Sequence, residues 1–455
     1  MSPTALRITA PLLATLPALA WAGAAPLPRA AVRTQRPNTW VKLSPVPGGP
    51  PSPQLGYEGA CAWDGRHGVL IRYGGHNQGG GGEQHSELWT FDPLSGRWTL
   101  KEPNTSPPGV CCAQQNVFDP VHGRYLRFPS FSGSHGWQWW REIYLNDSSV
   151  WSYDLTTNRW RNLRPLPAPS PRPLRCAAWD SGARAAVLFG GEGSREGTLT
   201  YDPAENTWSW PKPASQPAFR SGGNMAYDAS RRLHILFGSQ FDDDRQTWIY
   251  DSTRTLWSAV RPPTQPPTAQ NDAVLAYDPL RREALAVVKV TQGMGEQGRT
   301  HLESWAFDAG KLAWRKLSPD REPDPSGNRA RVLVFAPELN AALLENRPHP
   351  PYGPAEQQVW SYRFEDGPVA LPLPAPERSR VTEDLSVSVL SPRHVRLCWE
   401  PAGGDPAGYL VERAAVEVYT DDQLRRLKAQ TPPLVQPMVG AITRIGPFRT
   451  LTPRL

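Results

Sequence analysis

The sequence is poor in lysine, methionine and cysteine: its 455 residues include seven lysines, four methionines and five cysteines. Only 20% of the residues are charged, which excludes a coiled coil and a highly charged disordered protein. The net charge of +6 comes from arginines scattered along the chain, whereas a nucleic-acid-binding face would cluster its basic residues. We therefore expect no nucleic-acid partner.

Long apolar runs are also missing. The longest stretch, Ile8 to Ala22, is interrupted by two prolines and is too short for a comfortable membrane span. It follows a lone positive charge and ends among small residues suited to cleavage, which is typical of an export signal over residues 1–24. We expect export to the periplasm or the extracellular space, and no membrane span.

The five cysteines lack C-x-x-C or Cys/His spacing, so the sequence predicts no metal site and no cofactor. Cys111 and Cys112 are adjacent, and a bridge between them is an alternative to the small buried thiols that we expect. Tryptophan is abundant by contrast, at 19 residues, and proline and glycine number 51 and 38. Aromatic residues combined with turn formers favour an all-β protein of many short strands.

An aromatic–aspartate pair recurs along the chain, and in five copies a tryptophan follows the aspartate by six positions. Fixed spacing of this kind indicates repeated supersecondary units. The five pairs begin at Phe91, Tyr153, Tyr201, Tyr250 and Phe307, and the tryptophans are Trp98, Trp160, Trp208, Trp257 and Trp314.

Each unit has an earlier half, in which a second aromatic–aspartate pair such as Trp63-Asp64 precedes an apolar strand. Some of these strands end in a double glycine, as at Gly74-Gly75 and Gly190-Gly191. The unit of about 50 residues therefore comprises two hairpins, or four strands. It resembles the kelch repeat of the galactose oxidase/kelch-like superfamily, although several units lack the glycines. The resemblance implies a β-propeller over residues 38–365.

Counting units predicts six four-stranded blades. The sixth has no fourth-strand tryptophan of its own, and the segment 38–43 around Trp40 resembles the missing strand. We predict that this N-terminal strand closes the ring and removes an exposed sheet edge.

A Pro-rich linker is expected over residues 366–380, followed by a different domain over residues 381–455. Val395–Trp399 and Gly408–Arg413 read as strands, and 421–430 reads as a short helix. The segment resembles the first half of a fibronectin type III domain, so we expect an incomplete β-sandwich here.

Polar residues before the inner strands and after the second strands should meet at one mouth of the central channel. Such residues are Glu58, Arg175, Arg220, Asn224, Asp272 and Arg329 before inner strands, and His76, His135, Glu192, Gln240, Gln292 and Asn346 after second strands. Three arginines at one mouth would suit a carboxylate, a sulfate or a polar sugar. Alternatively, these arginines cap strand ends and form ion pairs with acidic residues of neighbouring blades.

The second blade carries an insertion in which Trp137, Trp139 and Trp140 lie beside His135. Indole rings in a loop can stack on sugars, or can pack on the next blade as a lid. No nucleophile–base pair accompanies these residues, so we expect no catalytic residues and a secreted binding scaffold, with a polar or acidic glycan or a peptide as ligand. The alternatives are a carbohydrate-active enzyme, either a galactose-oxidase-like oxidase or a sugar isomerase, and a purely structural surface protein.

Overall fold

The structure is a computed structural model. It describes residues 32–45, 51–53, 59–75, 87–107, 116–131, 146–147, 149–172, 174–191, 194–239, 245–268, 273–292, 299–348, 357–367, 375–377, 383–391, 394–400, 412–413, 416–418, 443–445 and 449–450. No helix among these residues is long and apolar enough to cross a membrane.

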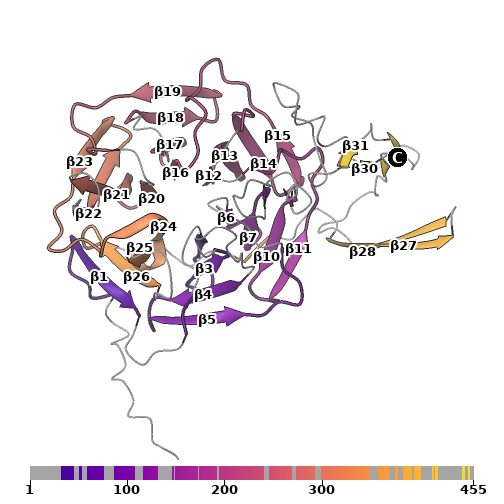
Figure 1. The fold of residues 1–455 in the computed structure, drawn as a ribbon, viewed down its shortest axis with the longest axis horizontal. Coiled ribbons are helices and arrows are strands. Elements are labelled where there is room, and N and C mark those ends of the chain that lie inside the picture. The colour runs from indigo at the N-terminus through magenta and orange to yellow at the C-terminus, as the bar shows by residue number, and fades with distance from the viewer. Residues whose placement is uncertain are drawn as a thin grey trace, which may run out of the picture.

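Six four-stranded antiparallel sheets form the blades of a β-propeller, as the sequence predicts (Figure 1). Within each blade the strands follow one another from the central axis outward, apart from the last blade. Blade 1 comprises β2 (Ala60–Asp64), β3 (Val69–Tyr73), β4 (Leu88–Asp92) and β5 (Arg97–Lys101). Blade 2 comprises β6 (Asn116–Asp119), β7 (Arg124–Arg127), β10 (Trp151–Asp154) and β11 (Arg159–Asn162). Blade 3 comprises β12 (Arg175–Asp180), β13 (Ala185–Gly190), β14 (Thr198–Asp202) and β15 (Thr207–Ser209).

The longest strands of the ring lie in blades 5 and 6. Blade 4 comprises β16 (Asn224–Asp228), β17 (Leu233–Phe237), β18 (Thr247–Asp251) and β19 (Leu256–Val260). Blade 5 comprises β20 (Val274–Asp278), β21 (Glu283–Gln292), β22 (Arg299–Asp308) and β23 (Ala313–Lys316). Blade 6 comprises β24 (Ser326–Ala336), β25 (Ala341–Pro348), β26 (Gln358–Arg363) and β1 (Thr39–Ser44).

The N-terminal strand closes the ring, which confirms the sequence prediction. Strand β1 pairs antiparallel with β26, with Trp40 opposite Tyr362. The ring of Trp40 lies 5.0 Å from that of Tyr362, and its side chain is 5% exposed. Closure therefore pairs the edge that β26 would otherwise expose.

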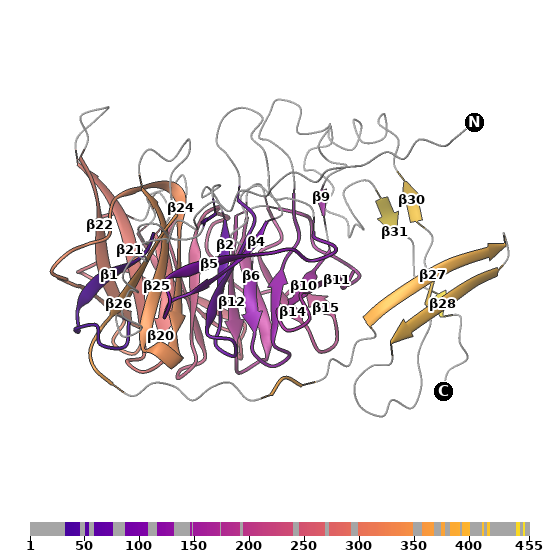
Figure 2. The same ribbon diagram turned by 90° about the horizontal axis from the view of Figure 1, so that it is seen from below.

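The aspartates of the repeat cap the hairpins. The Oδ1 atom of Asp64 accepts the backbone N–H groups of Arg66 and His67 at 3.0 and 3.2 Å. The residue four positions after each aspartate has a positive φ, such as 67° at Gly68. Because each aspartate-capped turn joins two antiparallel strands of one blade, these turns share one face of the ring. We call this the hairpin face, and it lies at the bottom of Figure 2.

The repeated tryptophans fill the seams between blades, as predicted. Trp98, Trp160, Trp208, Trp257 and Trp314 are all at most 6% exposed. The ring of Trp257 in blade 4 lies 5.1 Å from Phe189 in blade 3, and Trp314 lies 5.1 Å from Phe237 in the same way. Each such tryptophan thus contacts the second strand of the preceding blade.

Three of the six seam tryptophans, with Trp40 counted in, also donate a hydrogen bond to the preceding blade. Their Nε1 atoms reach hydroxyls of that blade's third strand, in the pairs Trp257–Thr198 at 2.9 Å, Trp314–Thr247 at 2.8 Å and Trp40–Ser304 at 2.9 Å. The equivalent position is Leu88, Val150 or Val359 in the other seams. There the buried Nε1 atoms of Trp98, Trp160 and Trp208 have no hydrogen-bond partner.

We expect Trp257→Phe to cost more unfolding free energy than Trp208→Phe, by about 1 kcal/mol, because only Trp257 loses a hydrogen bond. In a Val150→Thr background, Trp208 gains a hydroxyl acceptor, so Trp208→Phe should then cost nearly as much unfolding free energy as Trp257→Phe. Chemical denaturation of the variants measures these costs. Equal costs for the two Trp→Phe variants would show that the seam hydroxyls contribute nothing.

Deleting residues 1–45 should lower the melting temperature strongly, since it removes β1 and leaves β26 as an open edge. Deletion of residues 1–31, which spares β1, is the matched control and should leave the melting temperature unchanged. Scanning calorimetry separates the two. Equal melting temperatures for both truncated proteins would show that the pairing of β1 with β26 does not stabilise the propeller.

The residues described after the propeller form short antiparallel pairs. Strand β27 (Glu383–Ser391) pairs with β28 (His394–Glu400), which contains the predicted strand 395–399. Three-residue or shorter strands form the other two pairs, β29 (Glu412–Arg413) with β32 (Arg449–Thr450) and β30 (Val416–Val418) with β31 (Thr443–Ile445). The expected helix at 421–430 lies outside the described residues, and the fibronectin-like sandwich stays a prediction.

Cys61 and Cys176 are free and buried, as expected, while Cys398 is exposed. Cys111 and Cys112 lie outside the described part of the chain, and so do residues 1–24.

Candidate binding site

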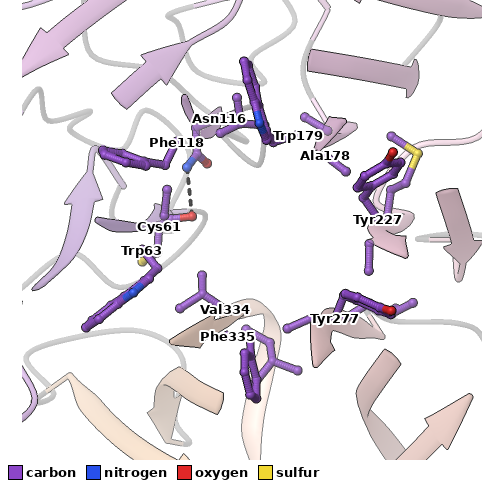
Figure 3. A pocket seen from close by; sticks show the side chains of 18 of the residues that line it. Cys61, Trp63, Asn116, Phe118, Ala178, Trp179, Tyr227, Tyr277, Val334 and Phe335 are labelled. Carbon is purple, nitrogen blue, oxygen red and sulfur yellow. Dashed lines mark hydrogen bonds between the residues drawn. The ribbon is translucent and has the colours of Figure 1, made fainter. Parts of the chain in front are cut away.

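The six inner strands surround a central channel with a cavity of about 410 Å³. Small side chains form much of its wall, among them Ala62, Ala178, Ala226, Ala276 and Val334. Figure 3 shows the opening that these short side chains leave between the strands. The channel is therefore apolar over its middle, because its lining residues present mainly methyl groups.

An aromatic residue directly precedes the end of every inner strand, and together the six form a girdle at the hairpin end of the channel. The girdle consists of Trp63, Phe118, Trp179, Tyr227, Tyr277 and Phe335. The labelled rings lean away from the centre of the opening (Figure 3). Polar tips reach the preceding blade: Tyr277 donates to Asp228 Oδ1 at 2.5 Å, and Trp63 Nε1 donates to Glu338 Oε2 at 2.7 Å. The girdle thus ties blades together and borders the channel without filling it.

The thiol and phenol groups in the channel wall are held in their neutral forms. Burial raises the pKa of the Cys61 thiol, and the nearby Glu345 raises it further. Burial also raises the pKa of Tyr227 and Tyr277, each of which hydrogen-bonds an aspartate. Neutral thiols and phenols suit non-covalent contacts with a ligand better than proton transfer near neutral pH. No group of three or more potential metal ligands occurs within the described ranges.

The opposite end of the channel, where inner strands begin and second strands end, is the loop face. Two arginines occupy equivalent places here. Arg175 and Arg331 each stand five residues before the last residue of an inner strand, and each is 1% exposed. Each donates to a serine five residues earlier: Arg175 Nη1 to Ser170 O at 2.9 Å, and Arg331 Nη1 to Ser326 Oγ at 2.8 Å. Arg331 also lines the channel.

Arg331 is a site residue that sequence reasoning missed. We predicted Arg329 instead, which lies in β24 two residues earlier, and its side chain lies outside the described part. A register irregularity between Ser326 and Arg331 shifts the start of the paired region. Counting back five residues from Ala336 would have identified Arg331.

Arg175 is engaged within its own blade. Its Nη2 atom forms a buried ion pair with Glu196, and burial lowers its pKa to about 10, against the opposing effect of Glu196. Arg220 is 6% exposed, and its Nη1 atom donates to the carbonyl of Gly238 at 3.4 Å. These contacts fit the capping role considered above, and ligand binding by the two arginines stays a prediction.

The backbone of Arg220 fastens blade 3 to the start of blade 4. Its carbonyl accepts the N–H of Gly191 at 2.9 Å. Gly190 has a φ of 76°, and a Cβ built there would lie 2.4 Å from the same carbonyl oxygen. The close approach explains the double glycine of this blade.

Asn346, predicted from the sequence, lies opposite Arg331 in the sheet and is fully buried. Its Nδ2 atom donates to the carbonyl of Asp324 at 2.9 Å, whereas its Oδ1 atom has no hydrogen-bond partner. Gln357, near it at the start of β26, is fully buried with both amide atoms unpartnered. Leaving buried polar atoms unsatisfied costs about 1–3 kcal/mol each, so these amides are an energetically unfavourable feature of this end of blade 6.

A second basic residue adjoins these amides. Arg347 follows Asn346 and is 3% exposed, and its pKa is lowered by burial and by the nearby Arg72. Arg72 is itself buried against Glu345, with which it forms an ion pair. The loop-face end of blade 6 therefore combines buried positive charge with unpartnered amides. The amide oxygens of Asn346 and Gln357 call for a hydrogen-bond donor such as a hydroxyl, whereas the Gln357 amide N–H calls for an acceptor.

Of the other predicted site residues, Asn224 lines the channel. The side chains of His76, His135, Trp137, Trp139, Trp140, Glu192, Gln240, Glu58, Asp272 and Gln292 lie outside the described residues. No protein-family profile matches the chain, and no curated protein matches it either.

A buried histidine crosses the seam between blades 3 and 4. His234 is fully buried in β17, at a position where β3 carries Leu70 and β13 carries Ala186. Its Nε2 atom lies 3.1 Å from Asp180 Oδ2, and Ser252 donates to the same oxygen at 2.7 Å. Burial lowers the pKa of His234, against the effect of Asp180. The imidazole is therefore neutral and donates to the carboxylate.

This pair predicts acid sensitivity. The folded-state pKa of His234 lies below its unfolded value of about 6.5, so its contribution to stability is complete above that pH and is lost as the pH falls towards the folded pKa. The slope contributed by one such group is at most about 1.4 kcal/mol per pH unit. His234→Leu should flatten the dependence of the unfolding free energy on pH between about 6.5 and 5. An unchanged slope in denaturation experiments would rule out this histidine as its source.

Proposed function

We propose that the protein is an exported binding scaffold whose loop face takes a polar or acidic ligand, with acidic saccharides as the favoured class. The observation that carries the proposal is the set of buried, unpartnered amide atoms at the loop-face end of blade 6, where Asn346 lies opposite Arg331 on one side of the sheet and Gln357 and Arg347 follow on the other side. A carboxylate accepts from guanidinium forks and from the Gln357 amide N–H, while sugar hydroxyls can donate to Asn346 Oδ1 and Gln357 Oε1, so an acidic sugar supplies both kinds of partner.

The charge balance supports an anion in particular. The lowered pKa of Arg347 reflects burial together with repulsion from Arg72, and a bound carboxylate would offset both effects. Arg331 lies in the channel wall, so a ligand held there would extend into the apolar channel. Sugar rings present apolar faces as well as hydroxyls, which suits such a lining.

Non-covalent recognition fits the channel better than turnover does. Its thiol and phenol groups, Cys61, Tyr227 and Tyr277, have pKa values raised by burial, which disfavours their use as nucleophile or base near neutral pH. The predicted stacking by Trp137, Trp139 and Trp140 belongs to the same proposal, because indole rings would hold the saccharide above the polar site.

Gln357→Leu tests the site directly. Replacing an unsatisfied buried amide by an apolar side chain should raise the melting temperature, and it should weaken binding of an oligogalacturonide by about tenfold. Gln265→Leu is the matched control, since Gln265 also has an unpartnered Oε1 atom but lies in the connection between β19 and β20. Calorimetric titration with the oligogalacturonide and with a neutral oligosaccharide measures the difference.

Equal affinity of the wild type and Gln357→Leu would refute the site. Absence of binding by the wild type would favour a structural role, and release of modified sugar would favour the enzyme alternative. If charge drives the contact, affinity should also fall with added salt.

A further inference from the structure

The hairpin face carries arginines at a position where the backbone favours glycine. In the inner hairpins, the fourth residue after the end of the inner strand has a positive φ in every blade. It is Gly68, Gly123 and Asn340 in blades 1, 2 and 6, and it is Arg184, Arg232 and Arg282 in blades 3, 4 and 5. Arginine at φ values of 55°, 59° and 60° costs free energy that glycine would avoid.

These three arginines do not stabilise the turns in which they lie. The turn at Asp228 is braced instead by the preceding residue, since Arg231 Nη1 lies 2.8 Å from Asp228 Oδ2. Arg281 braces Asp278 in the same way at 3.0 Å. Arg232 and Arg282 are exposed, and neither has an acidic partner among the described residues. Their charge is therefore directed to solvent from two adjacent inner hairpins.

The third arginine shows what this position recognises. Arg184 Nη2 lies 2.5 Å from a carboxylate oxygen of Glu377, which belongs to the chain beyond blade 6. The backbone of Glu377 donates its N–H to the carbonyl of Val121 in blade 2 at 2.8 Å. A proline-containing segment with a carboxylate is thus seated on the hairpin face through one main-chain hydrogen bond and one guanidinium (Figure 2).

A second carboxylate contacts the inner hairpin of blade 5. Glu365 Oε1 lies 3.1 Å from Arg281 Nε, and the Glu365 carbonyl accepts from Arg281 Nη2 at 2.5 Å. Arg281 stands one residue before the positive-φ position, so arginines at two neighbouring positions of the inner hairpins bind carboxylates within the molecule. Charge complementarity of this kind defines the class of partner.

We propose that Arg232 and Arg282 form a docking surface for an extended acidic peptide segment of a partner protein. Tyr227 and Tyr277 of the girdle precede the same two turns, and Tyr277 is partly exposed in the channel wall. An apolar or proline side chain next to the carboxylate would pack against this ring, while the guanidiniums bind the acid. The surface lies at the opposite end of the channel from the proposed saccharide site.

Arg232→Gly/Arg282→Gly is the decisive variant, because glycine suits both positive-φ positions and the fold should be retained. The probe is a fluorescent peptide of repeated Glu-Pro-Leu, with repeated Gln-Pro-Leu as its neutral counterpart. The full chain should bind the acidic probe in preference, and the double variant should bind it about tenfold more weakly. Arg97→Gln/Arg159→Gln removes the same charge from exposed outer strands and should change the affinity by less than about twofold.

Charge reversal gives an independent check. Arg232→Glu/Arg282→Glu should lose the Glu-Pro-Leu peptide and gain affinity for a Lys-Pro-Leu peptide. Equal losses in the glycine variant and in the outer-strand control would overturn the proposal, as would equal binding of the acidic and neutral probes by the wild type. Tighter binding of dextran sulfate or single-stranded DNA than of the peptide would overturn it too. Gln357→Leu should leave peptide binding unchanged, so failure here and failure of the saccharide site can be told apart.

Discussion

The ring depends on the tryptophan that each blade's outermost strand inserts into the seam with the preceding blade. The blades are separate sheets, so side-chain packing across each seam holds them together, supplemented by contacts such as the Gly191 N–H donated to the Arg220 carbonyl. Trp40 carries out this task for the last blade from a strand that is remote in the sequence. Ring closure therefore uses the same tryptophan packing as the other five seams.

The seams are chemically unequal although they are geometrically alike. Three tryptophans find a hydroxyl in the third strand of the neighbouring blade, and three face Leu88, Val150 or Val359. The blade 3–4 seam adds a buried histidine–aspartate pair that its neighbours replace with apolar residues. Repetition therefore sets the position of each residue, while single substitutions set how strongly a given seam holds and how it responds to pH.

Periodicity explains what could be predicted from the sequence. A spacing of six between aspartate and tryptophan requires a tight hairpin, and this spacing located five blades and the orphan strand at Trp40. Asn346 could be placed approximately for the same reason, because it lies in the last three residues of the second strand, β25. Arg331 could not, since the register irregularity in β24 breaks the count from the strand start. Nor does any sequence pattern distinguish a buried amide that is satisfied from one, such as Gln357, that is not.

The two faces of the ring differ because only one of them is closed by aspartate turns. At the hairpin face the aspartates satisfy the turn N–H groups from within, so the outward residues need no partner and can vary from glycine to arginine. At the loop face the strands begin and end without such caps, and the side chains of Arg175 and Arg331 are buried. Removing the hydrogen-bond partner of a buried charge costs unfolding free energy. A charge exposed on the hairpin face can be exchanged at little cost to the fold, whereas a buried one at the loop face is tied to its partners. The exposed arginines of the hairpin face can therefore be replaced independently of the seams, and the buried arginines of the loop face cannot.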